Sequence, residues 1–356
     1  MKLMRSPPSK RNDRPIDRGR NSAIQAQIEG DVGAILTMFP LKDERLFFIC
    51  ERGVTSGQLA DEIDPGRTNP SLPQIVQTPE LTYGASSPFI QRTLCVAAEL
   101  FDQTYFPQQV SRDDGLVLAL EAARALSEVE DTIIALDANE AKIRKQLASG
   151  EYKRHVVPKT PNLKGRVEGA VGHLREVALL AQKLADLFYP RAKSNIPFTS
   201  HLIDALKTQL PADDSLRPHV EWCLAQIERF FDHRNALIHG GPGKDQQFIL
   251  RDYEMQSDGN LVAPTIEIVH PDSPLPRMDI GQFLKDARES VSLTFETFVA
   301  GFCDRNAPQR HKGFVFGVEK SNQDRRTGKR FFWNGMFIPG FPLNEPKQDS
   351  GPTSTG

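Results

Sequence analysis

The residues Ser215–Gly243, SLRPHVEWCLAQIERFFDHRNALIHGGPG, carry the pattern that decides the predicted fold. Within them, apolar side chains recur at steps of four and seven residues, the spacing that lines one face of a helix: Leu216, Val220 and Ile227. Pro218 is tolerated because it falls in the first turn, where the missing N–H has no helical partner anyway. The run Gly-Gly-Pro-Gly then stops the helix. We therefore predict a helix over Ser215–His239.

Arg234 extends this apolar stripe. It follows Ile227 by seven residues, which make almost two turns at about 3.6 residues each. A guanidinium at the end of a buried stripe is costly to desolvate unless an anion meets it. Two kinds of anion remain open at this stage: a bound phosphate, or a core carboxylate from Glu176, Glu221 or Glu228.

Asn235 and His239 are four residues apart and share a helix face, so the Asn amide can hold the imidazole in one orientation or tautomer. Arg234 and His239 are five residues apart, which points them about 140° from each other in an unbroken helix. Because glycines follow His239 directly, we expect the last turn to unwind and to bring both side chains to one cleft. The simpler alternative is that His239 is a C-terminal residue favoured by the helix dipole.

The run Arg-Asn-Ala-Leu-Ile-His at 234–239 resembles the RX4-6H motif of the HEPN superfamily, and the resemblance extends over roughly residues 90–303. It implies a HEPN-like helical bundle with the motif on a late helix. The predicted fold class is therefore mainly α, with a small extended N-terminal accessory region and short β-hairpins added.

The same resemblance implies a metal-independent endoribonuclease, usually a homodimer, in which two copies of the motif meet at a shared cleft. By this analogy His239 is general base or acid, Arg234 clamps the phosphate, and Asn235 positions the imidazole or the phosphate. RNA is the implied substrate, and no metal or other cofactor is needed. A role as a prokaryotic toxin or defence effector, with an antitoxin or regulatory protein as partner, follows from the analogy alone.

Two other hypotheses stay open. Some relatives in the HEPN superfamily are inactive, so the chain is alternatively a catalytically inactive HEPN-like helical module for dimerisation, partner binding or nucleotide binding. A third hypothesis is a sensor whose N-terminal region recognises a ligand and controls the helices.

The rest of the chain divides by composition and periodicity. We predict a disordered basic arm over 1–22, a small accessory region with short strands over 23–88, a helical domain over 89–305 with a hairpin inserted at 246–270, a basic and aromatic hairpin over 306–341, and a disordered tail over 342–356. Apolar periodicity predicts further helices inside the helical domain: Leu94–Phe106, Asp113–Ala148, Leu163–Tyr189, Thr199–Leu210 and Asp279–Phe302.

The stretch 306–333 interleaves basic and aromatic residues, a combination that can hold single-stranded RNA by phosphate contact and base stacking. Its weak candidates for RNA binding are Arg325, Arg326, Lys329 and Arg330. We favour the alternative, an edge hairpin that packs its aromatic rings on the helices and exposes its charges.

Composition and motifs narrow the remaining classes. The formal net charge of -2 gives no global reason for polyanion binding, and the four cysteines are scattered singly. The sequence contains no run of about 18 apolar residues, the length needed to span a bilayer. We therefore expect a cytoplasmic protein with no membrane contact. HExxH, GxSxG and zinc-type clusters are missing, and Lys244 lacks P-loop spacing. We interpret Asp232 and His233 as a solvated helix face.

Overall fold

The computed structural model describes residues 14–22, 28, 30–41, 45–101, 104–149, 156–190, 199–257, 260–307, 314–321 and 330–337, with the side chains of all but 199–203 and 337. The predicted tail and the first part of the predicted N-terminal arm lie outside these residues. About 51% of the structure is helical and about 20% is strand, with several antiparallel sheets. The protein is therefore a mixed α/β fold, and the prediction of a mainly α bundle is wrong.

The chain forms two compact units, Met1–Ser87 and Pro88–Gly356. The first is built on a four-stranded antiparallel sheet in which each strand pairs with the next along the chain. Its elements are β1 (Ile35–Pro40), β2 (Leu46–Cys50), β3 (Val54–Leu59), α2 (Ala60–Ile63) and β4 (Ile75–Leu81). Phe39 and Phe47 are fully buried and stack across β1 and β2, with ring centroids 5.4 Å apart.

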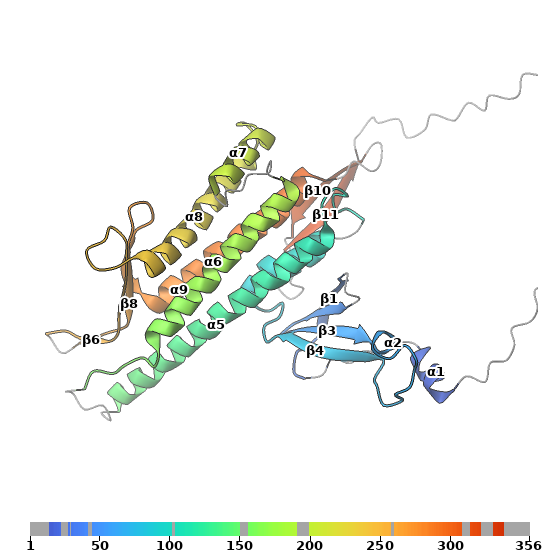
Figure 1. Ribbon diagram of the computed structural model, residues 1–356, viewed down its shortest axis with the longest axis horizontal. Coiled ribbons are helices and arrows are strands. Elements are labelled where there is room, and N and C mark those ends of the chain that lie inside the picture. Colours follow the sequence, from blue (N-terminus) through green and yellow to red (C-terminus); the bar gives the residue numbers. More distant parts are fainter. Residues whose placement is uncertain are drawn as a thin grey trace, which may run out of the picture. The chain divides into compact units, whose positions relative to one another are not determined.

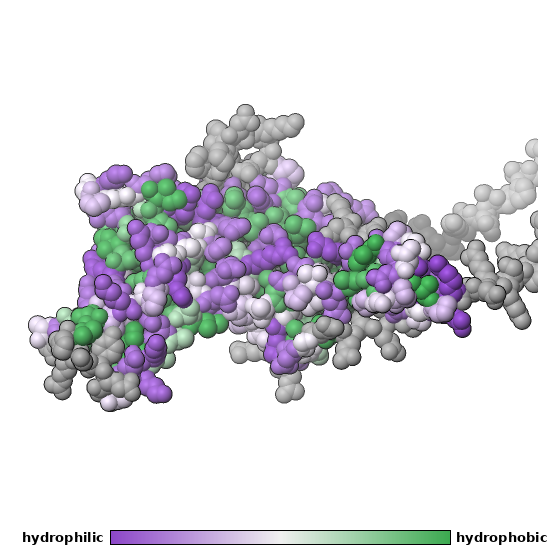
Figure 2. All heavy atoms as spheres, turned by 60° about the horizontal axis from the view of Figure 1, so that its bottom comes forward, coloured by the Kyte–Doolittle hydropathy of each residue, from purple (hydrophilic) through white to green (hydrophobic). Residues whose placement is uncertain are grey.

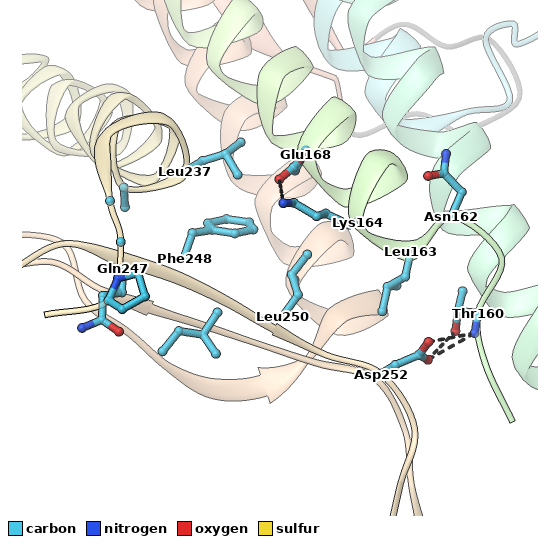
Figure 3. Close-up of a pocket in the computed structure, with 15 residues that line it drawn as sticks. Thr160, Asn162, Leu163, Lys164, Glu168, Leu237, Gln247, Phe248, Leu250 and Asp252 are labelled. Atoms are coloured by element: carbon cyan, nitrogen blue, oxygen red, sulfur yellow. Dashed lines mark hydrogen bonds and ion pairs between the residues drawn. The ribbon is translucent and has the colours of Figure 1, made fainter. Parts of the chain in front are cut away.

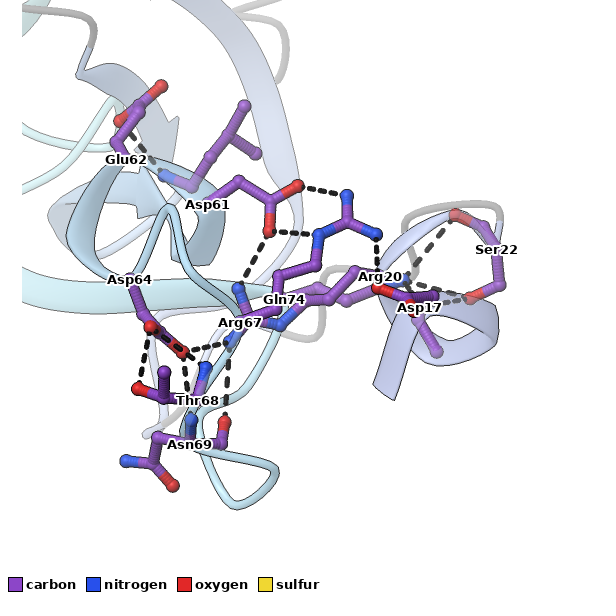
Figure 4. A network of polar contacts seen from close by, with 12 residues as sticks. Asp17, Arg20, Ser22, Asp61, Glu62, Asp64, Arg67, Thr68, Asn69 and Gln74 are labelled. Atoms are coloured by element: carbon purple, nitrogen blue, oxygen red, sulfur yellow. Dashed lines mark hydrogen bonds and ion pairs between the residues drawn. The ribbon is translucent and has the colours of Figure 1, made fainter. Parts of the chain in front are cut away.

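A short helix, α1 (Pro15–Arg20), lies where the sequence predicts a disordered arm. Figure 4 shows the polar network that holds it: Arg67 donates hydrogen bonds to Asp61 and to Asp17 of the helix. These charged pairs supply the contacts that the arm's few apolar side chains cannot. The prediction of disorder over 1–22 is therefore wrong for this helix.

The second unit is organised around four long helices that pack against one another. They are α5 (Arg112–Ala148), α6 (Leu163–Phe188), α8 (Arg217–His239) and α9 (Ile280–Arg305). Shorter pieces precede and join them: α3 (Pro88–Ile90), the π-helical turn η1 (Gln91–Cys95), α4 (Val96–Leu100) and α7 (Thr199–Gln209). Figure 1 shows α6 running between α5 and α8, so the helix that carries the motif packs on α6.

Local sequence explains where these helices begin and which faces they bury. The Ser111 side chain accepts a hydrogen bond from the Asp114 N–H at the start of α5, and Asp279 does the same for Gln282 at the start of α9. Apolar residues at helical spacing then form the core, with the largest rings on α9: Phe295, Phe298 and Phe302.

A three-stranded antiparallel sheet lies between α8 and α9 in the sequence and contacts both helices. Its strands are β5 (Gln247–Arg251), β8 (Thr265–Val269) in the centre and β9 (Leu275–Asp279), while β6 (Glu254–Met255) and β7 (Leu261–Val262) pair separately. The sheet stands at the end of the helices where α8 stops (Figure 1). It therefore forms one wall around the end of the motif helix.

Strands with unfavourable sequences account for the error in fold class. β3 contains Gly57 and β9 contains Pro276, yet each pairs with a neighbouring strand. Pro276 is tolerated because β9 is an edge strand of its sheet. Cross-strand pairing and burial, rather than local propensity, make these segments strands.

A last hairpin, β10 (Phe314–Lys320) with β11 (Phe331–Phe337), packs on α9 and α4. On the face drawn in Figure 2, hydrophilic residues predominate and hydrophobic residues form small separate groups. Within the part of the chain that the structure describes, no helix is long and apolar enough to cross a membrane.

Candidate functional site

The last turn of α8 is intact. The Gly240 N–H donates to the Ala236 carbonyl at 3.0 Å, and His239 is the final residue of the helix. The expected unwinding is therefore wrong, because the glycine run leaves the helix only after His239. Arg234 and His239 consequently point about 140° apart around α8.

The buried face of α8 turns along its length. Near its start, Val220 and Ile227 continue one stripe into the helical core, whereas near its end His233 and Ala236 are the buried residues. This shift follows from the sheet, which contacts the end of α8. Arg234 and Asn235 are partly buried as a result, and His239 is exposed.

The Arg234 guanidinium has no carboxylate partner in the part of the chain that the structure describes. Of the three carboxylates considered from sequence, Glu176 lies 3.5 Å from His173 and Glu221 pairs with Arg217 at 2.9 Å. Neither these residues nor Glu228 pairs with Arg234, and no other described residue forms a hydrogen bond or ion pair with it. The fixed-carboxylate alternative is therefore not found.

A second arginine packs against the same part of α8. The Arg175 guanidinium of α6 stacks over the Phe231 ring of α8, with its central carbon 4.9 Å from the ring centroid. Its Nε is buried without a hydrogen-bond partner. Phe231 precedes Arg234 by three residues, so the two are neighbours on one helix face. In the described ranges, this face of α8 thus has Arg234 on the helix itself and Arg175 of α6 packed against it, and no carboxylate neutralises either by direct contact.

Asn235 and His239 share a face of α8, as their spacing predicts, but no hydrogen bond joins them within the described residues. The His239 carbonyl accepts a hydrogen bond from Lys244 Nζ at 2.7 Å. Lys244 therefore places a cation at the C-terminal end of α8, where the helix dipole favours positive charge.

Asp232 and His233 are tied to the sheet rather than solvated, which corrects the interpretation from sequence. His233 is 1% exposed, and its Nε2 lies 3.2 Å from the Ser273 carbonyl oxygen. Asp232 accepts a hydrogen bond from the Ser273 hydroxyl at 2.7 Å. Burial lowers the pKa of His233 to about 4, so its ring is neutral at neutral pH. These two residues fasten the end of α8 to the turn before β9.

A pocket of about 700 Å³ opens between the end of α8, the start of α6 and strand β5. Figure 3 shows the Phe248 ring projecting from β5 beside Leu237 of α8 and toward Lys164 of α6. Asp252 at the end of β5 accepts hydrogen bonds from the Thr160 N–H and hydroxyl at 3.1–3.2 Å, which ties the strand to the segment before α6. We call this cavity the β5 pocket.

The motif residues border the β5 pocket but do not line it. Leu237 and Gly240 contribute to its wall, whereas Arg234, Asn235 and His239 do not. Arg234 is about 60° from Leu237 around the helix. His239 is likewise about 60° from Ala236, which also lines the pocket, so Arg234 and His239 lie at opposite borders of it.

The weak RNA-binding candidates have a different environment. Arg330 forms a bidentate ion pair with Glu296, whose side chain is 3% exposed. The Trp333 indole donates to the Leu100 carbonyl at 2.9 Å and packs near Tyr105. Trp333 thus packs on the helices as the alternative expects, whereas Arg330 is paired with α9 rather than exposed. Arg325, Arg326 and Lys329 lie outside the described residues.

Sequence reasoning missed Arg175, Phe248 and Asp252. None belongs to a motif, and each acquires its place through a contact with a residue distant in the chain. Among the described residues, no group of three or more His, Cys, Asp or Glu side chains is arranged to hold a metal ion. The chain matches no known family model, no curated protein and no solved structure.

Proposed function

We propose that this protein is a metal-independent endoribonuclease of the HEPN type that cuts RNA at a cleft shared by two copies of the end of α8. The observation that carries the proposal is the partly buried Arg234 without a carboxylate partner among the described residues. A guanidinium in that setting is stabilised by an external anion, and a phosphate diester matches its planar donors. Arg175 supplies a second guanidinium over Phe231, which is one turn before Arg234 on the same helix face.

These residue types suit one reaction. The RNA 2′-oxygen attacks the adjacent phosphorus, the new O2′–P bond forms, and the P–O5′ bond breaks to leave a 2′,3′-cyclic phosphate and a 5′-hydroxyl. His239 takes the 2′-hydroxyl proton or gives one to the leaving 5′-oxygen. Arg234 stabilises the negative charge that grows on the phosphorane oxygens.

The shared cleft follows from the direction of the side chains. Within one chain Arg234 and His239 diverge by about 140°, so one copy does not bring both to a single phosphate. Ile238 lies between them around the helix and is 50% exposed, which offers an apolar contact to a second copy. A two-fold pair of α8 ends then supplies two imidazoles, one as base and one as acid.

RNA cleavage in EDTA tests the proposal. The unmodified protein is incubated with a mixed set of RNAs beside Arg234→Ala, Asn235→Ala and His239→Ala. The matched control is His219→Ala, which removes an exposed imidazole near the start of the same helix. We expect the control to cut normally and His239→Ala to lose roughly 100-fold or more of the rate. Intact RNA with the unmodified protein, or undiminished cleavage by His239→Ala, would show that the proposal is wrong.

A dilution experiment tests whether the cleft is shared by two copies. Specific activity and light scattering are followed while the protein is diluted. A site made by two copies loses activity as the dimer dissociates. Activity that stays constant in a dilute monomer contradicts the shared cleft but leaves the ribonuclease itself in place.

The second candidate function is a binding module without catalysis. It is favoured by the intact last turn of α8, which keeps Arg234 and His239 apart, and by the missing hydrogen bond between Asn235 and His239 in the described structure. This module would bind RNA or a nucleotide through Arg234 and leave it uncut. Binding that is weakened by Arg234→Ala and unchanged by His239→Ala, with no cleavage, identifies it.

A further inference from the structure

The β5 pocket has no part in the reaction described above, although it adjoins Arg234. Its volume of about 700 Å³ lies within the range of roughly 300–1,000 Å³ that is typical of small-molecule sites. Resting on the proposed function, we infer that this pocket binds the nucleoside next to the scissile phosphate, with its base stacked on Phe248.

Phe248 provides the surface for stacking. Its side chain is only partly buried, and it projects from β5 into the pocket (Figure 3). It packs against no other aromatic ring among the residues that the structure describes. Every nucleobase presents a π face, so an unstacked ring in a pocket suits a base of any sequence.

The remaining wall is apolar at its centre and polar at its edge, as ligand pockets commonly are. Leu237 and Leu250 lie beside the Phe248 ring. Lys164 and Glu168 stand at the α6 side, with Lys164 Nζ 3.7 Å from the Glu168 carboxylate. Base rings fit the apolar centre, and the edge offers both a hydrogen-bond donor and an acceptor.

The pocket and Arg234 lie within the span of one nucleotide. Leu237 is part of the wall and follows Arg234 by three residues, so their Cβ atoms are about 5–6 Å apart on one helix face. A phosphate on Arg234 thus brings its attached nucleoside to the mouth of the pocket. The exposed ammonium of Lys164 is placed to meet the phosphate on the other side of that nucleoside.

Nucleotide binding tests the inference without depending on cleavage. The four nucleoside 3′-monophosphates are titrated into the full chain and into Phe248→Leu, Phe248→Tyr and Phe314→Leu. Phe248→Leu keeps an apolar side chain but removes the ring, Phe248→Tyr keeps the ring, and Phe314→Leu removes a partly exposed phenylalanine from strand β10. We expect binding of at least one nucleotide to weaken roughly tenfold in Phe248→Leu and to remain in the other two variants.

Two outcomes overturn the inference: none of the four nucleotides binds at millimolar concentration, or Phe248→Leu binds them as well as the unmodified protein does. RNA cleavage measured in parallel separates the two proposals. Cleavage that depends on His239 while Phe248→Leu binds nucleotides normally refutes the pocket and leaves the ribonuclease standing. Nucleotide binding that depends on Phe248, with no cleavage of any RNA, refutes the ribonuclease and supports the pocket as the site of a binding module.

Discussion

The end of α8 and the β10–β11 hairpin each hold a partly buried arginine, and the two arginines have opposite surroundings. Arg330 of the hairpin meets the buried Glu296 carboxylate in a bidentate pair. Arg234 of α8 meets no carboxylate among the residues described. Sequence composition ranks the hairpin as the more basic region, yet its described arginine is already neutralised. An available cation, rather than a local surplus of charge, therefore marks the candidate site.

Removing Arg234 should have the largest effect of the changes proposed here, and this effect should be on activity rather than on stability. Arg234→Ala is expected to slow RNA cleavage roughly 100- to 1,000-fold, because it deletes a donor to the phosphorane oxygens. The free energy of unfolding should change by no more than about 0.5 kcal/mol, since no internal ion pair is lost. Cleavage rates and urea denaturation check both halves. A large loss of stability would show that Arg234, like Arg330, has a structural role, and would contradict this prediction.

Removing the paired arginine should act on stability instead. Arg330→Ala leaves the Glu296 carboxylate buried, with Arg92 as the nearest remaining cation at 3.8 Å. We expect a loss of about 3 kcal/mol in the free energy of unfolding, because the buried carboxylate loses its bidentate partner and keeps only a more distant cation. RNA cleavage by the folded variant should be unchanged. Urea denaturation that shows no destabilisation would contradict the structural role of this pair.

His233 and His239, both near the end of α8, should differ in their effect on the pH dependence of stability. Unfolded His233 takes up a proton near the ordinary pKa of 6.5, whereas the folded ring resists protonation until about pH 4. Stability is therefore complete above pH 6.5 and falls as the pH is lowered toward 4, by about 3 kcal/mol. Urea denaturation at several pH values should show this slope in His239→Gln and a reduced slope in His233→Leu. An equal slope in both variants would assign the pH dependence to other groups.

The smallest expected effect concerns Arg175. Arg175→Gln should weaken binding of a 2′-O-methylated RNA, which cannot be cut, roughly fivefold and reduce the slope of log affinity against log salt by about 1. The matched control is Arg166→Gln, which removes an exposed charge from the same helix. An unchanged salt slope in Arg175→Gln would restrict phosphate contact to Arg234.

The long helices could be predicted closely from sequence because their signal is local. Periodicity and the glycine run place the end of α8 at His239, and Pro190 limits α6, predicted to end at Tyr189 and observed to end at Phe188. The mixed fold class could not be predicted in this way. β9 becomes a strand only because β8 lies beside it, and its own Leu-Pro-Arg-Met-Asp sequence gives little indication of this.

For the candidate site too, the sequence predicts the residues but not their surroundings. Arg234, Asn235 and His239 follow from one run of residues, and their order on the helix is fixed by its pitch. Their environment is not: the absence of a carboxylate at Arg234 within the described residues, the stacking of Arg175 on Phe231 and the Phe248 ring in the β5 pocket all depend on how separate segments pack. Local sequence patterns identify candidate side chains, whereas tertiary contacts determine which of those side chains are already paired within the protein.

The position of the sheet between α8 and α9 determines when the candidate site can be completed during synthesis. β5 follows the motif within a few residues, but its partner β8 is Thr265–Val269 and the sheet is completed only by Leu275–Asp279. A nascent chain that has just released α8 from the ribosome holds Arg234 and His239 but has no finished wall behind Phe248. Since domains fold as units while translation proceeds, the end of α8 and the pocket beside it reach their final form together, once Leu275–Asp279 has left the ribosome.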